Sequence, residues 1–460
     1  MGGKAMPPAC GTPAIPPCIP GGDLSALPGG NHIILAPRPN IKAPHRSNFE
    51  PRVGFAWEFM PKTLLRAGAG LTYDVFSGIT QENNNIQALW PNNNFGSAVY
   101  NQIGQAVTTL DAAEGQGLDF GPDPTGPWNS IAFGGYCFDP NKKPPYSIQY
   151  NVQLQREFTP DLTLSAAYSG SVTRRLDYGY FANAATTPGP GSADQVNALR
   201  PFPYVGAPFP YSFDTGRANY NSLQVELNRR FRRGLMLLVA YTWSKSIDNG
   251  ASGWFGSENG ASGTSSIQNE YDMKSNRSVT SYNVPQNLVV SGSYELPVGR
   301  GKRWLPRGPL SWIVGNWRTD VIQAIHSGAP WNPYIDGDLA NVGRFDSYER
   351  PNLVGDPTPA HRSINAWVNP AAFAIPQFAY GNLGRNVFRS APVFETDFTL
   401  ARVFPITEQV HFEFRAEAFN VFNMMNYGVP NVDMSNPTFG QISSLATTPR
   451  QLQLSLRLNF

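Results

Sequence analysis

Charged residues are scarce in this chain of 460 residues. Asp, Glu, Lys and Arg make up 15% of it, against about 25% in typical soluble domains. The formal net charge is only +2, so the chain lacks the basic excess that binds nucleic acid. We therefore exclude nucleic acid as a partner.

Long apolar runs are also missing. No stretch of about 18 apolar residues occurs, which excludes a membrane-spanning helix but not a membrane-spanning strand, since barrel strands need only about 9–11 residues of alternating pattern. Met1 is not followed by a basic region and an apolar segment, so no signal peptide is visible. That start is expected for a cytoplasmic protein and equally for a chain that begins inside a longer one.

Cysteine is rare, with three residues in the chain: Cys10, Cys18 and Cys137. The first two lie in the Pro-rich stretch "PACGTPAIPPCIP", and two interpretations of them stay open. They are either incidental thiols or a small disulfide loop formed outside the cytoplasm. No histidine neighbours them, so a zinc site is not indicated.

Catalytic motifs are absent. The five histidines show no HExxH spacing, and no GxSxG segment follows a strand. The glycines of "VGRGKRW" (298–304) precede no helical pattern, which argues against a phosphate loop. The acidic triplet "DGD" (336–338) indicates a turn rather than a calcium site. The sequence thus predicts no enzyme, no cofactor and no metal site.

What the chain does have is strict alternation, clearest in the closing "QLQLSLRLNF" (451–460). A strand places alternate side chains on opposite faces, so this segment has one apolar and one polar face. The apolar face consists of Leu452, Leu454, Leu456, Leu458 and Phe460. Such a face touches either a protein core or lipid.

The same alternation recurs along the chain and predicts about eleven strands. They are expected near 50–59, 63–74, 146–157, 161–170, 220–230, 235–245, 284–296, 314–326, 394–403, 409–422 and 450–460.

The connections between these segments alternate between short and long. The long ones are rich in Gly, Pro, Asn and Ser and cover 75–145, 171–219, 246–283, 327–393 and 423–449. Compact soluble domains rarely hold several loops beyond about 12–15 residues, whereas outer-membrane barrels join strands by short periplasmic turns and long extracellular loops. The pattern favours an all-β, antiparallel transmembrane β-barrel of the outer-membrane type.

Several segments have a distinctive sequence: "NFEPRVGFAWEF" (48–59), "PYSIQYNVQLQRE" (145–157), "YNSLQVELNRRF" (220–231), "ERPNLVGDP" (349–357), "FRAEAFNVFNMMNYGVPN" (414–431) and the closing strand. Together they resemble the C-terminal barrel half of TonB-dependent receptors, specifically the Oar-like receptors of the acidobacterial type. The resemblance implies a Gram-negative outer-membrane barrel of about 22 strands around an N-terminal plug, with active uptake.

The resemblance also implies the partners. These are outer-membrane lipid, an inner-membrane TonB-type energy transducer acting through the plug, and the barrel-assembly machinery. The alternating leucines 452–458 and the terminal Phe460 resemble the signal that this machinery reads.

The chain departs from that family pattern at its start, where no plug, no partner-binding box and no first barrel half are visible. We expect residues 1–49 to be a Pro/Gly-rich extracellular loop segment and residues 50–460 to be the C-terminal portion of the barrel. Single-chain bacterial barrels have even strand numbers, so eleven strands predict an incomplete half-barrel.

Candidate ligand contacts are the aromatic residues of the long connections, namely Trp254, Trp331, Tyr334 and Trp367. Loop aromatics offer contact area at low entropic cost, although the same residues could pack loop on loop. The substrate cannot be read from the sequence.

The functional hypothesis is a fragment of an outer-membrane TonB-dependent transporter. The first alternative is a passive porin-like barrel or a surface adhesin. The second is a secreted soluble β-sandwich that acts as a binding module, whose interior would be apolar rather than polar.

Overall fold

The computed structural model describes residues 48–73, 137–138, 143–201, 209–250, 267–344, 348–407 and 409–460. The predicted disulfide pair Cys10 and Cys18, the ligand candidate Trp254 and most of the 1–49 segment lie outside these residues.

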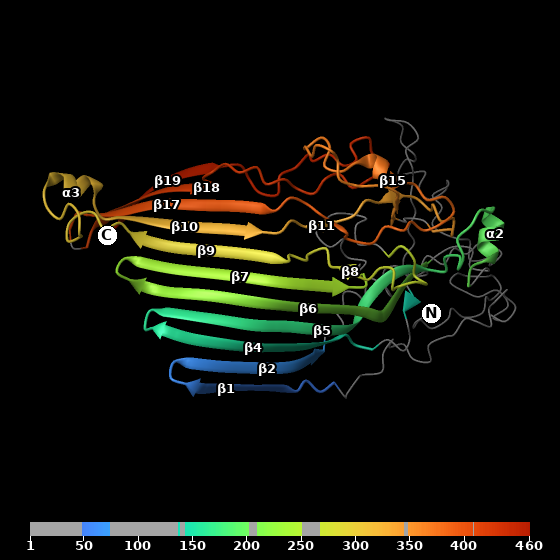
Figure 1. Cartoon of the computed structure of the whole chain (residues 1–460), viewed down its shortest axis with the longest axis horizontal. Coiled ribbons are helices and arrows are strands. Elements are labelled where there is room, and N and C mark those ends of the chain that lie inside the picture. Colours follow the sequence, from blue (N-terminus) through green and yellow to red (C-terminus); the bar gives the residue numbers. More distant parts are fainter. Residues whose placement is uncertain are drawn as a thin grey trace, which may run out of the picture.

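One antiparallel sheet dominates the structure, and its strands follow one another in chain order (Figure 1). The main path is β1 (Arg52–Met60), β2 (Thr63–Tyr73), β4 (Tyr146–Thr159), β5 (Leu162–Ala182), β6 (Phe209–Arg232), β7 (Leu235–Asp248), β9 (Gln286–Glu295), β10 (Trp317–His326), β17 (Val393–Pro405), β18 (His411–Phe419) and β19 (Gln451–Asn459). The eleven predicted strands are confirmed. Among the described residues β1 and β19 form the two ends of the path and do not pair with each other, as expected for a partial barrel.

The remaining elements are short. β3 (Cys137–Phe138) pairs with β6 and β8 (Ser278–Val279) with β7, while three two-stranded pairs and three helical segments lie in the connections. The pairs are β11 (Pro330–Trp331) with β16 (Phe388–Arg389), β12 (Ile335–Asp336) with β13 (Tyr348–Glu349), and β14 (Asn352–Leu353) with β15 (Phe373–Ala374). The helices are α2 (Ala193–Ala198), α3 (Pro309–Val314) and the 3₁₀ turn η8 (Pro370–Ala372).

Two-residue turns join β1 to β2, β4 to β5 and β6 to β7 at one end of the sheet, where the longer β9–β10 connection with α3 also lies (Figure 1). The connections that follow β5, β7 and β10 lie at the other end. In the turn Arg233–Gly234 between β6 and β7 both residues have positive φ (53° and 81°). Two left-handed residues in a two-residue loop match the right-handed twist of the flanking strands. The end that carries this turn is called the short-turn end below.

Two strands are longer than the sequence predicts. β5 has 21 residues and β6 has 24, so the predicted loop 171–219 is wrong over residues 171–182 and 209–219. The alternation fails there because Arg174 and Arg175 interrupt it, and the register shifts between Arg174 and Leu176. At about 3.3 Å per residue β5 spans roughly 70 Å, more than twice the ~30 Å hydrocarbon core of a bilayer.

Two strand ends also differ from the expected ones. The predicted strand 314–326 begins only at Trp317, because α3 extends to Val314 and Asn316 adopts φ 60°. The predicted strand 409–422 ends at Phe419, because Asn420 turns the chain with φ 48°. In the described parts of the chain, no helix is long and apolar enough to cross a membrane.

One face of the sheet is apolar from strand to strand. A single row of register partners crosses nine strands and contains only apolar and aromatic residues: Trp57, Leu65, Leu154, Ala166, Val225, Tyr241, Leu288, Ile325 and Phe394. On the last strand the same face carries Leu454, which is 75% exposed. This surface is called the apolar face.

The opposite face is polar. At the C-terminal side one row of partners consists of Gln453, Glu417, Thr399, Asp320 and Ser293. The described strands of the main sheet form one layer with a polar inner side, whereas a sandwich needs two sheets packed through apolar faces. The soluble β-sandwich alternative is therefore wrong.

Candidate functional site

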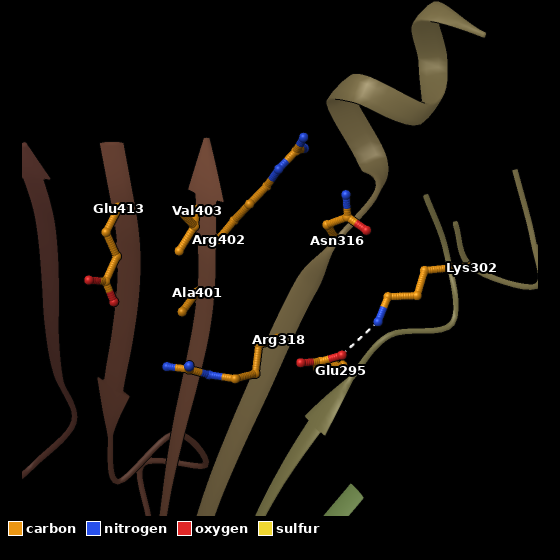
Figure 2. Close-up of a pocket in the computed structure, with 8 residues that line it drawn as sticks. All are labelled: Glu295, Lys302, Asn316, Arg318, Ala401, Arg402, Val403 and Glu413. Carbon is orange, nitrogen blue, oxygen red and sulfur yellow. Dashed lines mark hydrogen bonds and ion pairs between the residues drawn. The ribbon is translucent and has the colours of Figure 1, made fainter. Parts of the chain in front are cut away.

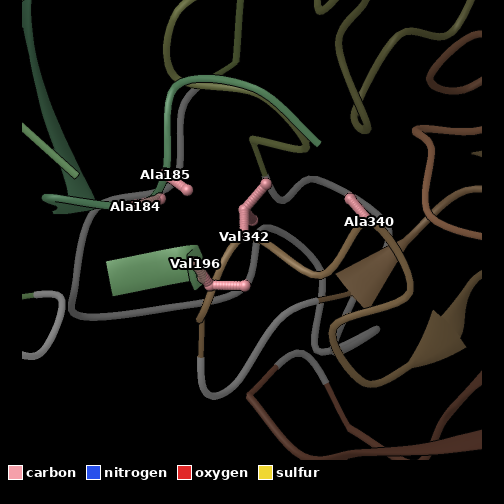
Figure 3. Packing of buried hydrophobic residues seen from close by; sticks show 5 residues of the cluster. All are labelled: Ala184, Ala185, Val196, Ala340 and Val342. Carbon is pink, nitrogen blue, oxygen red and sulfur yellow. The ribbon is translucent and has the colours of Figure 1, made fainter. Parts of the chain in front are cut away.

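The long connections fold against each other into what we call the loop cluster, formed by the described parts of 183–208, 249–285, 327–392 and 420–450. Its first core consists of Ala184, Ala185, Val196, Ala340 and Val342 (Figure 3). The Ala185 N–H donates to the Val342 carbonyl at 2.8 Å. The connections after β5 and β10 are thus held together by apolar packing and by backbone hydrogen bonds.

A second core lies nearby and is aromatic. Trp331 is 1% exposed and packs with Val368, Ala372, Phe373 and Leu383. Its ring centre lies 5.0 Å from that of Phe388, within the range of favourable aromatic pairs. The best-packed part of the described chain is therefore the loop cluster and not the sheet.

Buried ion pairs tie the loop cluster to the sheet and its connections to one another. Asp248, at the end of β7, accepts a hydrogen bond from Arg385, and both side chains are almost completely buried. Arg344 lies 3.5 Å from Glu270, again with both side chains buried. Losing one partner of such a pair leaves a buried charge uncompensated, which is strongly destabilising.

Glu349 is the most perturbed carboxyl of the loop cluster. Burial raises its pKa to about 7, although the Ala340 N–H, which lies 3.1 and 3.2 Å from the two carboxylate oxygens, acts in the other direction. Burial likewise raises the pKa of Glu270, against the opposing effect of Arg344. The loop cluster therefore contains two carboxyls that favour the protonated form more than usual, and of these Glu349 takes up its proton near neutral pH.

Asp338 of the "DGD" triplet has a structural role. Its carboxylate accepts the N–H groups of Val342, Gly343 and Arg344 at 2.9, 2.6 and 3.2 Å. Three backbone donors on one carboxylate hold the loop 338–344 in a tight turn. Among the residues that the structure describes, no group of three or more His, Cys, Asp or Glu could hold a metal ion.

A cavity of about 330 Å³ opens beside the aromatic core. It is lined by Trp331, Pro357, Thr358, Arg362, Trp367, Val368, Val387, Phe388 and Arg389. Arg362 stacks over the Trp367 ring at 4.9 Å, an arrangement that favours a cation over the negative face of the indole. We call this cavity the tryptophan pocket.

Hydrogen-bond donors predominate among the side chains that line the tryptophan pocket. The buried Trp331 Nε1–H has no acceptor among the described residues. Arg389 donates to the carbonyls of Asn283 and Gly328 at 2.9 and 3.1 Å, and burial lowers its pKa. Two arginines, an indole N–H and no carboxylate line the pocket, a set of groups that suits a ligand with acceptor oxygens and a flat apolar part.

The structure brings two of the predicted ligand residues together and separates a third. Trp331 and Trp367 both line the tryptophan pocket, whereas Tyr334 lies outside it, with its backbone paired to Val432 and Met434. Trp331 is mainly a packing residue. The sequence analysis missed Arg362 and Arg389. The one sequence feature that could have indicated them is that charged residues are rare in these connections.

A second cavity, of about 310 Å³, lies at the short-turn end (Figure 2). Its lining residues come mainly from β9, β10, β17 and β18: Glu295, Lys302, Asn316, Arg318, Ala401, Arg402, Val403 and Glu413. Lys302 pairs with Glu295 at 2.6 Å, and Arg318 with Asp320 at 3.3 Å. The polar face thus carries paired charges of both signs where a barrel would have its lumen.

The residues predicted to form the assembly signal lie on an exposed edge. Leu452, Leu454 and Leu456 of β19 and the terminal Phe460 are all largely exposed, and the four leucines share the apolar face. Within the described residues, β19 pairs with β18 on one side and with no strand on the other.

The model of one protein family, the outer membrane beta barrel domain, matches residues 20–453. The chain therefore belongs to the outer membrane β-barrel domain family and is a protein of the Gram-negative outer membrane. The leucines of the closing strand therefore face lipid and not a protein core, because the apolar face of such a barrel meets the membrane.

Solved outer-membrane proteins of similar shape include the ferripyoverdine receptor FpvA of Pseudomonas aeruginosa, with 11% identity, a TM-score of 0.41, and coverage of 89% of this chain and 33% of that one. The transporter YddB of Escherichia coli is 12% identical, with a TM-score of 0.45 and coverage of 90% and 40%. The iron transporter FrpB of Neisseria meningitidis is 11% identical, with a TM-score of 0.40 and coverage of 90% and 39%.

The chain spans between about a third and two fifths of the length of these proteins. No curated protein matches the sequence.

Proposed function

We propose that this chain is the C-terminal barrel part of an Oar-like, TonB-dependent receptor that takes up a substrate across the outer membrane. The observation that carries the proposal is a meander of eleven strands with a continuous apolar face, a charged polar face and a cluster of long connections that, in their described parts, pack together at the end opposite the short-turn end. Porins and receptors share the first two features. A densely packed cluster of long loops fits a receptor, which recognises its ligand from outside.

The proposed orientation places the loop cluster outside the cell and the short-turn end in the periplasm. Residues 1–49 would then form part of an extracellular connection. The polar face would surround a plug contributed by a part of the polypeptide that precedes this chain, and an inner-membrane energy transducer would act through that plug. The closing strand with Phe460 would be presented to the assembly machinery.

The tryptophan pocket is the proposed ligand contact. Arg362 and Arg389 supply positive charge, Trp367 and Phe388 supply apolar walls, and Trp331 supplies a donor. Trp254 and Tyr334 are further contacts proposed from the sequence. The combination favours an anionic, partly aromatic or unsaturated compound, because guanidinium groups bind carboxylates and related anions through paired hydrogen bonds.

Conductance in a planar bilayer tests the proposal. The polypeptide that contains this chain is purified from outer membranes and reconstituted. A receptor with a plug gives no steady current until mild denaturant loosens the plug, whereas a passive porin, the main alternative, conducts immediately. An open channel formed by a 50.4-kDa polypeptide would contradict the receptor proposal.

A further inference from the structure

The connection between β9 and β10 differs in composition from the rest of the chain. Residues 297–316 contain Arg300, Lys302, Arg303 and Arg307 and no Asp or Glu. The same stretch contains two tryptophans, Trp304 and Trp312. Basic and aromatic side chains mixed at a strand end are typical of segments that lie at a membrane surface.

This segment is folded back rigidly and does not form an open loop. The backbones of Gly299 and Gly315 touch, and a Cβ added at Gly315 would come 2.3 Å from the Gly299 Cα. The Asn316 N–H donates to the Val298 carbonyl at 2.8 Å, and the Gly299 N–H to the Trp304 carbonyl at 2.9 Å. The connection is therefore a preformed unit, and α3 is part of it.

Arg402 fastens α3 to the outside of the sheet. Its register partners are Trp317 on one side and Phe414 on the other, and Phe414 pairs with Leu456. Arg402 therefore lies in a row of the apolar face. Its side chain reaches toward α3 (Figure 2) and donates to the carbonyls of Trp312 and Ile313.

The guanidinium is flanked by aromatic rings on that face. It lies 4.2 Å from the ring centre of Phe404 and 5.7 Å from that of Trp317, and Arg402 is 4% exposed. Trp312 of α3 packs on the same Phe404, with ring centres 6.0 Å apart. A charge in a lipid-facing row is costly when it is bare, so α3 shields Arg402 while Arg402 holds α3 in place.

The surface of α3 is strongly apolar and largely exposed. Leu310, Trp312 and Ile313 are 54%, 54% and 62% exposed, and Trp304 in the preceding turn is 56% exposed. Arg300, Arg303 and Arg307 are exposed beside them. This surface continues the apolar face beyond the strand ends through Phe404 and Trp317, and the apolar face itself meets lipid.

We propose that residues 297–316 form an interfacial anchor that binds anionic phospholipid headgroups at the rim of the barrel. The apolar side chains of α3 and Trp304 enter the boundary between headgroups and acyl chains, and the three exposed arginines hold the phosphates. In the orientation proposed above, on which this placement rests, the headgroups are those of the periplasmic leaflet.

The anchor is tested by lipid quenching. The natural cysteines at positions 10, 18 and 137 are replaced by Ser, and a fluorophore is attached to Ile313→Cys in the polypeptide purified from outer membranes. The protein is reconstituted in brominated phosphatidylcholine with or without phosphatidylglycerol. The matched control is Ile375→Cys, an exposed apolar position in the loop cluster.

We expect quenching at position 313 to exceed that at position 375 several-fold and to increase with phosphatidylglycerol. The increase should disappear in the triple variant Arg300→Gln, Arg303→Gln, Arg307→Gln and at high salt, which screens exposed charges. Arg402→Gln should reduce the quenching by releasing α3. Arg415→Gln, which changes an arginine on the polar face away from α3, should not.

Equal quenching at positions 313 and 375 would overturn the proposal. So would quenching at position 313 that does not change when phosphatidylglycerol is added. A separate experiment tests the proposed orientation. Labelling of Ile313→Cys on intact cells by an impermeant reagent would place the anchor outside the cell and contradict the receptor orientation, while the lipid contact could still stand.

Discussion

At the scale of single residues, Leu454 and Gln453 are neighbours on β19 that point to opposite faces. Leu454 lies near the middle of the strand on the apolar face, and Gln453 lies in the polar row with Glu417. Leu454→Arg should destabilise the folded barrel by about 2–4 kcal/mol, because an arginine at the bilayer midplane is that costly. Gln453→Arg should cost little.

The two variants are compared by urea unfolding of the reconstituted protein. They add the same side chain one residue apart, so each serves as the control for the other. Equal losses of unfolding free energy would mean that the two faces of β19 meet the same environment.

The pKa of Glu349 makes the loop cluster sensitive to pH. A carboxyl whose pKa is raised to about 7 in the folded protein, from an ordinary 4.5, contributes stability that is complete below pH 4.5 and is lost as the pH rises through 7. Residues 338–350 should therefore open more readily at pH 8 than at pH 5. Hydrogen exchange, corrected for its intrinsic pH dependence, measures this opening.

The matched variant is Glu349→Gln, which keeps the shape of the protonated carboxyl and removes its titration. In this variant the opening of the loop should depend less on pH than in the parent protein. The pH dependence that remains is assigned to Glu270, whose pKa is raised as well. An opening that increases toward acid pH would show that these carboxyls are stabilised in their charged form.

Residue identity alone did not reveal the site. Trp331 and Trp367 were predictable as loop aromatics, but only the structure shows that one is a core residue and that both border a pocket with Arg362 and Arg389. These contacts join segments separated by up to 58 residues of irregular chain, numbered here from Trp331 to Arg389. No periodic pattern reports contacts of that kind.

At the scale of elements, the strands were predictable wherever alternation is maintained. β19 and β4 match the sequence closely, because one of their faces must be apolar along its whole length. The outer halves of β5 and β6 were missed because they extend past the membrane, where no lipid imposes a pattern and backbone pairing alone keeps the strands together. α3 was missed because six residues are too few for a helical period.

The alternation of connection lengths makes a prediction about sidedness. With Cys10, Cys18 and Cys137 replaced by Ser, Ile375→Cys should be labelled by an impermeant thiol reagent on intact cells, because it is exposed in the loop cluster. Thr159→Cys, at the short turn between β4 and β5, should be labelled only after the cells are opened. Labelling of Thr159→Cys but not of Ile375→Cys on intact cells would show that the orientation is the opposite of the proposed one.

At the scale of the whole molecule, the sheet has two free edges. β1 pairs only with β2 and β19 only with β18 in the described structure. Unpaired backbone groups at an edge cost several kcal/mol each in lipid, and eleven strands is an odd number where bacterial single-chain barrels use even ones. We therefore expect the eleven strands to form part of a barrel that further strands complete.

Gel mobility without boiling tests that central claim most directly, because closed barrels resist detergent until they are heated. The 460-residue chain and the longer polypeptide that contains it are refolded side by side in detergent and treated with trypsin. We expect a fast-migrating, protease-resistant band only for the longer polypeptide. Such a band from the 460-residue chain alone would show that β1 and β19 close on each other, and the porin-like alternative would then be correct.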